Sequence, residues 1–329
     1  MNAGPGRRMF LLRAFAAGTA ALGIPRYAEA AGYPTKPIRL IVPSAAGGSP
    51  DAVCRILADG LHPVLGQAIV VDNRPGAGGS IGMSELARAQ PDGYTLGYAN
   101  VGTLAINRSL FARLPYDPDA FTGIAMMGTV QSALVVRNDL PVTTVKALID
   151  YAKARPGRLT MGSAGNGTTG HLGGELFKAM TGTFMLHVPY GGSAAALREL
   201  IGGRIDLMFD NLSSVAPFIT SARVRALGVS GPRRSALFPD LPTIQEVGVN
   251  GYETTAWGGI VGPPGLSQEI VTLLNQAINR VLSTPGVHEA YGKLCVETLA
   301  APPGLIMALA KREAPRWAEI VKRSGASAD

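Results

Sequence analysis

The chain has 329 residues, of which 47% are hydrophobic and 16% charged, a composition that excludes a disordered polymer. Its 42 glycines follow no fixed period, which excludes collagen-like and repeat architectures. The formal net charge of +7 suits anionic ligands but is spread too thinly along the chain to indicate nucleic acid binding.

The N-terminus has the pattern of an export signal. Three arginines precede an apolar run at 14–24 that is too short to span a bilayer, and residues 28–30 offer an A-x-A cleavage site. Residues 7–12 resemble the twin-arginine motif, but Gly6 replaces the usual Ser or Thr, so twin-arginine and general secretory routing both stay open. Cleavage after residue 30 removes four arginines and one glutamate, which lowers the net charge from +7 to +4.

The mature chain opens with strand, small-residue loop and helix in alternation. The strand 38–42 leads through a small-residue loop to Ser49-Pro50-Asp51, which predicts a helix with Ser as N-cap, Pro at the first position and an acid in the first turn. A strand at 68–71, a glycine-rich loop at 73–80, a helix at 81–89 and a strand at 95–98 follow. This alternation predicts a parallel α/β sheet whose loops face one cleft at the carboxyl ends of the strands.

A long apolar segment and a later, shorter strand predict a division into two domains. The nearly continuous run 124–137 is long enough for a strand that crosses between domains, and the strand 224–229 is expected to cross back. The predicted organisation is a signal peptide at 1–30, a first domain of 31–129 with 231–329, and a second domain of 130–230. Helices are expected near 267–282 and 304–323, the latter amphipathic and packed on the first domain.

The stretch Leu159 to Leu172 predicts a small-anion site. A short strand runs into Gly-Ser-Ala-Gly-Asn-Gly-Thr-Thr-Gly and then into a helix, so several backbone N–H groups at the helix N-terminus lack intrahelical partners. Thr168 or Thr169 is expected to cap the helix, and no Glu or Gln stands three residues later to close a capping box. A purely structural tight turn remains an alternative for these glycines.

The same stretch has the spacing of a dinucleotide fingerprint at Gly165, Gly167 and Gly170. That fingerprint requires an acidic residue near the end of the next strand, but residues 184–190 contain no Asp or Glu. The sequence therefore disfavours nucleotide binding.

Catalytic and metal-binding patterns are lacking in the sequence. It contains no Gly-x-Ser-x-Gly elbow, no HExxH motif and no Cys/His cluster, so we expect no enzyme, no catalytic residue, no metal and no cofactor. Cys54 and Cys295 are the only cysteines, and the sequence leaves open whether they form a disulfide.

Two loops from different halves of the chain predict a clamp for an elongated dianion. The loops 46–51 and 163–169 each end at a helix N-terminus, where small residues let backbone N–H groups approach carboxylate oxygens. For Asp51, stabilisation of its own helix remains an equal alternative. The predicted ligand-binding residues are Ser44, Ala46, Gly47, Gly48, Asp51, Ser163, Ala164, Gly165, Gly167, Thr168, His171, Tyr190 and Asn211.

An ordered set of motifs resembles the substrate-binding proteins of tripartite tricarboxylate transporters, the Bug-type periplasmic receptors. The motifs are Tyr33-Pro34-x-x-Pro37-Ile38-Arg39, Ala46-Gly47-Gly48-x-x-Asp51, Asn73-Arg74-Pro75-Gly76-Ala77-Gly78-Gly79, Gly162-Ser163-x-Gly165-x-Gly167-Thr168-x-x-His171-Leu172, Val188-Pro189-Tyr190-x-Gly192, Gly202-Gly203-Arg204-Ile205-Asp206, Leu241-Pro242-Thr243 and Gly262-Pro263-Pro264. The resemblance implies an α/β type II periplasmic binding fold, with two α/β domains joined by two crossing strands and a ligand cleft between them.

In that family, the loops matching Ala45 to Asp51 and Ser163 to Thr168 hold a carboxylate through backbone amides and bridging waters. The family's first loop usually has an aromatic residue before Ala-Gly-Gly, whereas this chain has Ser44-Ala45 there, so the pocket wall is expected to differ.

The resulting hypothesis is a monomeric periplasmic receptor for a small carboxylate, which it delivers to the permease of a tripartite tricarboxylate transporter. A di- or tricarboxylate, an acidic amino acid and an aromatic carboxylate all remain open as ligands. The alternatives are a ligand-sensing or regulatory receptor without a dedicated permease, with a sensor ectodomain as its partner, and an exported hydrolase.

Overall fold

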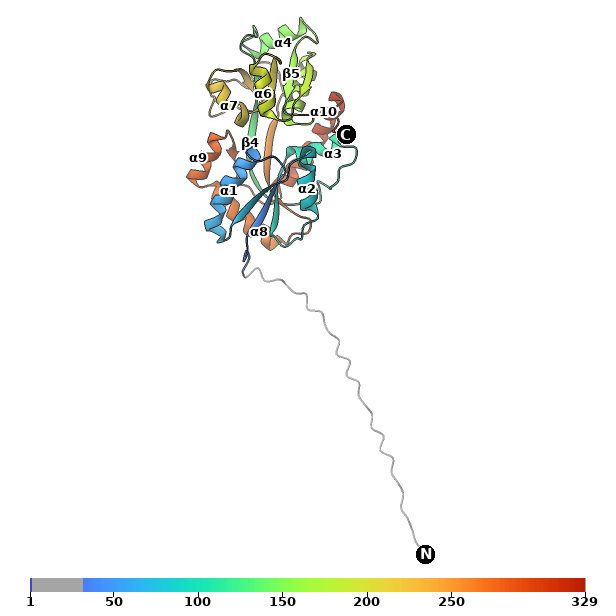
Figure 1. The fold of residues 1–329 in the computed structure, drawn as a ribbon, viewed down its shortest axis with the longest axis vertical. Helices are drawn as coiled ribbons and strands as arrows, with labels where there is room; N and C mark the ends of the chain where they lie inside the picture. Colours follow the sequence, from blue (N-terminus) through green and yellow to red (C-terminus); the bar gives the residue numbers. More distant parts are fainter. Residues whose placement is uncertain (2–31, 329) are drawn as a thin grey trace. The chain divides into compact units, whose positions relative to one another are not determined.

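Strand β4 (Thr122–Val136) joins two α/β lobes in the computed structural model, which describes Met1 and residues 32–328 (Figure 1). Its first part pairs antiparallel with β9 (Thr255–Gly262) in the first lobe. Its last five residues pair with β7 (Leu207–Asn211) and β8 (Arg225–Val229) in the second lobe. The predicted crossing strand near residues 124–137 is thereby confirmed. The predicted signal peptide lies outside the described residues.

The sheet of the first lobe has the order β2 (Ile69–Asn73), β1 (Ile38–Val42), β3 (Thr95–Asn100), β9 and β4, with the short β10 (Glu297–Thr298) paired to β4. The first three strands are parallel, as predicted, whereas β9 runs antiparallel to both of its neighbours. The carboxyl ends of β1, β2 and β3 therefore meet at one edge.

Alternate residues of β1 supply the two cores of this lobe. Ile38, Leu40 and Val42 point to one face of the sheet and pack with α1 (Ser49–Leu65), α8 (Gln268–Leu282) and α9 (Pro285–Lys293). Ile41 faces the opposite core, which contains α2 (Ser80–Ala87), a π-helical turn at Gly102–Ile106, α3 (Asn107–Leu110) and α10 (Leu305–Ser324). This is the period-two alternation of a strand buried on both faces. The predicted packing of the C-terminal amphipathic helix on the first lobe is confirmed.

The second lobe repeats this arrangement around the end of β4. Its sheet runs β4, β7, β5 (Thr160–Ser163) and β6 (Leu186–Pro189), the last three strands being parallel. Leu134 packs toward α4 (Val145–Lys153) and α5 (Thr169–Thr181), while Ala133 packs toward α6 (Ser193–Ile201) and α7 (Leu212–Thr220). Among the described residues, the structure contains no helix with the length and hydropathy needed to cross a membrane.

The return crossing is made by β9, so its predicted assignment to residues 224–229 was wrong. Strand β8 pairs with β4 only at Ala133 to Val136, within the second lobe. The chain beyond it still packs there, since Tyr252 belongs to the second-lobe core. The Ser230 hydroxyl accepts the Ser132 N–H at 2.9 Å and donates to the Thr254 carbonyl, which ties the two crossing strands together. The domain boundaries stay a prediction, and we propose that the second domain extends through Thr254.

Helix α1 begins one residue earlier than predicted. Gly48 is the N-cap and makes no side-chain cap, so Ser49 is already the first helical residue. The short elements α9 and β10 were missed because neither is long enough to show a clear hydrophobic period.

Candidate functional site

A cavity of ≈ 680 Å³ lies between residues of the first and second lobes. Its wall is built from loops that follow the carboxyl ends of β1, β2 and β3 on one side and of β5, β6 and β7 on the other. This is the edge at which ligands bind in open α/β sheets, as the alternation of elements predicted.

The N-terminus of α5 faces this cavity. Thr168 is the N-cap, and its hydroxyl accepts the His171 N–H and donates to the Gly165 carbonyl at 2.8 Å. Thr169 and Gly170 both line the cavity, and as the first two helical residues they have no intrahelical acceptor for their N–H groups. The helix therefore presents two backbone donors and the positive end of its dipole to the cavity.

Glycine is required where this loop turns. Gly165 and Gly167 have φ values of +135° and +75°, a region that side-chain-bearing residues rarely adopt. A Cβ at Gly167 would also overlap the side chain of Leu110 in the first lobe. The loop of the second lobe thus lies directly against α3.

His171 supports the loop from behind and does not line the cavity. Its Nδ1 accepts the Gly167 N–H at 3.1 Å, and its ring stacks on that of His187. Burial, together with the neighbouring His187 and Lys178, lowers the pKa of His171 to about 3. Burial and Lys178 likewise lower the pKa of His187 to about 4. Both rings are therefore neutral at pH 7, and His171 acts as an acceptor for the loop backbone.

Ser163 and His187 have the spacing of a nucleophile and its base. The Ser163 Oγ lies 2.7 Å from His187 Nε2, but Ser163 is fully buried and does not line the cavity. The contact ties β5 to β6 and offers no reacting atom to the cavity.

The first loop reaches the cavity with fewer residues than predicted. Ser44, Ser49 and Pro50 line it, whereas residues 46–48 are exposed and lie outside its wall. Asp51 turns back on its own loop, where one carboxylate oxygen accepts the Gly47 N–H at 2.8 Å and the Arg55 Nε at 3.1 Å. Burial works against ionisation, but Arg55 and the Gly47 amide lower the pKa of Asp51 below its usual value. These contacts favour the alternative in which Asp51 stabilises its own helix.

A third glycine-rich loop, Pro75 to Gly79, forms a large part of the wall. The sequence predicted that this loop faces the cleft, but none of its residues is among the predicted ligand-binding residues. The Asn107 side chain holds it by donating to the Gly78 carbonyl at 3.0 Å, and Asn100 to Gly102 adjoin it. The sequence contained a signal, because this loop follows β2 at the same sheet edge as the other two. Trp257 also lines the cavity, while its Nε1 donates to Glu313 at 2.9 Å.

Asp210 is a second residue that sequence reasoning missed. It is the last but one residue of β7, lines the cavity and is 6% exposed. Its Oδ1 accepts the Asn211 N–H at 2.8 Å, whereas its Oδ2 is buried without a hydrogen-bond partner. Burial raises the pKa of Asp210 to about 6, against the opposing effects of the Ser193 hydroxyl and the Asn211 amide.

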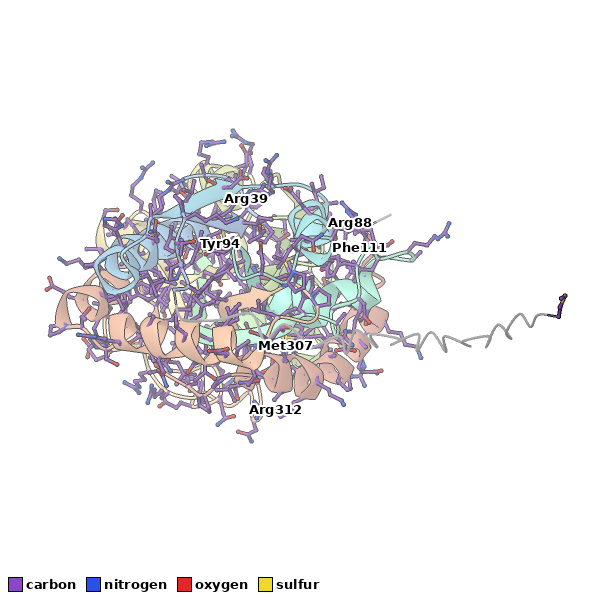
Figure 2. All side chains as sticks on the ribbon, turned by 90° about the horizontal axis from the view of Figure 1, so that it is seen from below. Arg39, Arg88, Tyr94, Phe111, Met307 and Arg312 are labelled. Atoms are coloured by element: carbon purple, nitrogen blue, oxygen red, sulfur yellow. The ribbon has the colours of Figure 1, made fainter. Side chains whose placement is uncertain are left out.

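The cavity wall carries no cationic side chain: among the described residues that line it, none is Lys, Arg or His. Figure 2 shows Arg88 and Arg312 at the outside of the protein, and both are exposed. The described residues also include no group of three or more His, Cys, Asp or Glu that could hold a metal ion. An anionic ligand would therefore be met by backbone N–H and hydroxyl groups.

The structure brings five of the thirteen predicted ligand-binding residues into the wall: Ser44, Ala164, Gly167, Thr168 and Asn211. The other eight lie outside it: Ala46, Gly47, Gly48, Asp51, Ser163, Gly165, His171 and Tyr190. Ligand contact by any of the thirteen stays a prediction. Cys54 is buried, Cys295 is partly buried, and both are free in the structure.

Comparison with known proteins shows a matching family model and several similar solved structures. A family model described as the tripartite tricarboxylate transporter family receptor matches residues 53–326. The structure of R. palustris Rpa4515 with adipate is 38% identical, covers 90% of this chain and 99% of that chain, and has a TM-score of 0.84. The periplasmic binding protein BugD is 35% identical over 90% of this chain and 99% of its own, with a TM-score of 0.80.

A third structure, MatC (Rpa3494) from Rhodopseudomonas palustris with bound malate, is 30% identical. It covers 88% of this chain and 100% of that chain, with a TM-score of 0.79. These likenesses confirm the expected fold of two α/β domains of the periplasmic binding protein type.

Proposed function

The chain belongs to the tripartite tricarboxylate transporter receptor family, and from this premise we propose that it captures a small carboxylated metabolite in the cavity between its lobes. One observation carries the proposal: the backbone donors of Thr169 and Gly170 face a cavity whose described wall contains no cationic side chain. Such a site recognises an anion by oriented backbone dipoles.

The physical fit is that of a carboxylate and not of a polyphosphate. Each charge-assisted hydrogen bond contributes about 1.5–3 kcal/mol, and a helix N-terminus adds about 0.3–1 kcal/mol. A few such donors are enough for a singly charged carboxylate group but leave a dense phosphate charge uncompensated. The cavity volume of ≈ 680 Å³ also suits a small molecule.

Two similar structures support this ligand class, because one was solved with adipate and the other with malate. Both compounds are dicarboxylates. Ligand groups at the two ends would meet α5 in the second lobe and the hydroxyls of Ser44 and Ser49 in the first lobe. Closure of the lobes on such a ligand is part of the proposal.

We further propose that the protein is exported to the periplasm by its N-terminal signal and delivers the ligand to the permease of a tripartite tricarboxylate transporter. Family membership supports both steps. The export signal itself lies outside the described residues, and the routing stays open.

A thermal-shift screen of the mature chain tests the ligand class. The probes are malate, succinate, adipate, citrate, glutamate and benzoate, with glucose and putrescine as neutral and cationic controls. A ligand that binds only the native state stabilises it by mass action, by about 2.7 kcal/mol at a concentration of a hundred times Kd. This added stability raises the melting temperature. At least one carboxylate should raise the melting temperature. A shift with glucose or putrescine and none with any carboxylate would overturn the proposal.

A further inference from the structure

We propose that Asp210 selects carboxylates that carry a hydrogen-bond donor on the carbon next to the carboxylate, as α-amino and α-hydroxy acids do. The inference rests on the proposed function, since it names the kind of carboxylate that the cavity takes. It comes from the pairing of a free helix N-terminus with an unpartnered acceptor in the same wall.

The Asp210 carboxylate can accept at least one more hydrogen bond. The Asn211 N–H donates to its Oδ1, and the Ser193 hydroxyl lies close enough to lower the pKa of the carboxylate. Its Oδ2 is nevertheless buried without a hydrogen bond of normal geometry, and the residue is 6% exposed. A buried acceptor left without a donor costs about 1–3 kcal/mol, and more when it is charged. The adjoining Asn211 Oδ1 is likewise buried and unpartnered. A ligand donor placed between them would satisfy both.

Asp210 lies close to the proposed carboxylate site. A Cβ built at Gly170 would overlap the carbonyl oxygen of Phe209 and would lie 3.7 Å from the Asp210 Cα. The first turn of α5 therefore rests on the end of β7. Thr169, Gly170 and Asp210 also line the same cavity. The proposal places the ligand carbon next to the bound carboxylate within reach of the Asp210 side chain.

The charge of Asp210 decides which ligands fit. No cationic side chain is present among the described residues of the wall, and with a pKa of about 6 the group is mostly ionised at pH 7.5. A plain dicarboxylate offers this anion only apolar carbon or a like charge. An ammonium or hydroxyl group offers it a charge-assisted hydrogen bond.

Calorimetric titration at pH 7.5 with matched ligand pairs tests the inference. The pairs are malate and succinate, glutamate and glutarate, and 2-aminoadipate and adipate, which differ by one donor next to a carboxylate. In at least one pair the donor-bearing compound should bind about tenfold tighter, the effect of one charge-assisted hydrogen bond. The malate arm reports a hydroxyl donor, and the other two arms report an ammonium donor.

Two variants assign the preference to Asp210. Asp210→Asn keeps an oxygen for the Asn211 N–H but removes the charged acceptor, so the preference should fall to within about threefold while the plain dicarboxylate binds as well or better. Asp240→Asn removes the same charge at an exposed position outside the cavity and should leave the preference unchanged. The unliganded Asp210→Asn protein should melt no lower than wild type, because a buried unpaired charge is removed.

Several results would overturn the inference. They are equal binding within every pair, a preference that survives Asp210→Asn, or binding of none of the six compounds while another carboxylate binds. Succinate binding that strengthens at pH 5.5 and is lost in Asp210→Asn also overturns it, because Asp210 would then act as a protonated donor. Failure of every carboxylate in the thermal-shift screen is a different result, which removes the proposed function itself.

Discussion

The ring of His171 lies 3.7 Å from that of His187, centroid to centroid, and the two planes differ by only 9°. Each ring holds a different part of the same loop, since His171 accepts the Gly167 N–H and His187 contacts the Ser163 hydroxyl. The stack therefore sits directly beneath the backbone that we assign to carboxylate binding. Both rings must stay neutral for it to persist.

Acidification should destabilise the protein through this stack. The pKa of His171 is about 3 in the folded state, against about 6.5 in the unfolded chain. Between these two pKa values the unfolded chain binds more protons than the folded protein does. The contribution of neutral His171 to the free energy of unfolding is therefore fully present above about pH 6.5. It falls as the pH is lowered, by up to about 1.4 kcal/mol per pH unit. Urea unfolding at pH 7, 6 and 5 measures this slope.

His171→Asn is the matched variant, because its Oδ1 can still accept the Gly167 N–H but does not titrate. Its stability should fall less steeply with acidification than that of the wild type. Identical pH slopes in the two proteins would contradict the assignment of this dependence to His171.

Gly170→Ala should destabilise the protein by about 1–3 kcal/mol, the usual cost of overpacking a tight contact. The added Cβ would overlap the Phe209 carbonyl, and backbone atoms cannot move aside as a flexible side chain can. Gly191→Ala is the control, because a Cβ there meets nothing within 4 Å and should change stability by less than about 0.5 kcal/mol. Both changes in the free energy of unfolding are measured by urea denaturation, provided that the m value stays the same. A Gly170→Ala variant as stable as the wild type would refute the close approach of α5 to β7.

Asp51→Ala should lower the stability of the unliganded protein by about 0.5–1.5 kcal/mol, because the Gly47 N–H at the start of α1 loses its acceptor. Arg55→Ala should have a much smaller effect, since the Arg55 side chain is 52% exposed. Thermal unfolding without ligand measures both changes. Unchanged stability of Asp51→Ala together with lost carboxylate affinity would instead establish Asp51 as a direct ligand contact.

The loops of the site could be predicted from the sequence because each follows an apolar strand and precedes a helical period. That order places glycines such as Gly47, Gly78 and Gly167 at the carboxyl edge of a parallel sheet without any knowledge of tertiary contacts. The cap at Thr168 and the crossing strand β4 were predictable for the same local reason.

What the sequence could not supply was the direction in which side chains point. Asp51 and Asp210 are both acids beside a strand or helix end, yet one bonds its own loop while the other faces the cavity. His171 lies on the predicted loop but turns inward, since its acceptor is needed by Gly167. The strand that crosses back was assigned to the wrong residues. Ile244 and Tyr252 pack in the core of the second lobe, but nothing in the sequence around them indicates which lobe they contact.

The central claim is that backbone amides at the α5 N-terminus bind the carboxylate, and Thr169→Pro tests it most directly. Thr169 is the first helical residue, where proline is tolerated, and Thr168 has φ −66° and ψ 156°, which suits a residue before proline. The substitution removes one backbone N–H and keeps the helix. Thr169→Ala removes the same side chain and keeps the N–H.

The measurement is calorimetric titration of both variants with the carboxylate that binds the wild type most tightly. Thr169→Pro should weaken binding by about tenfold or more at an unchanged unliganded melting temperature, whereas Thr169→Ala should bind within about threefold of wild type. Equal affinity in the Thr169→Pro and Thr169→Ala proteins would contradict the claim that this backbone N–H holds the ligand.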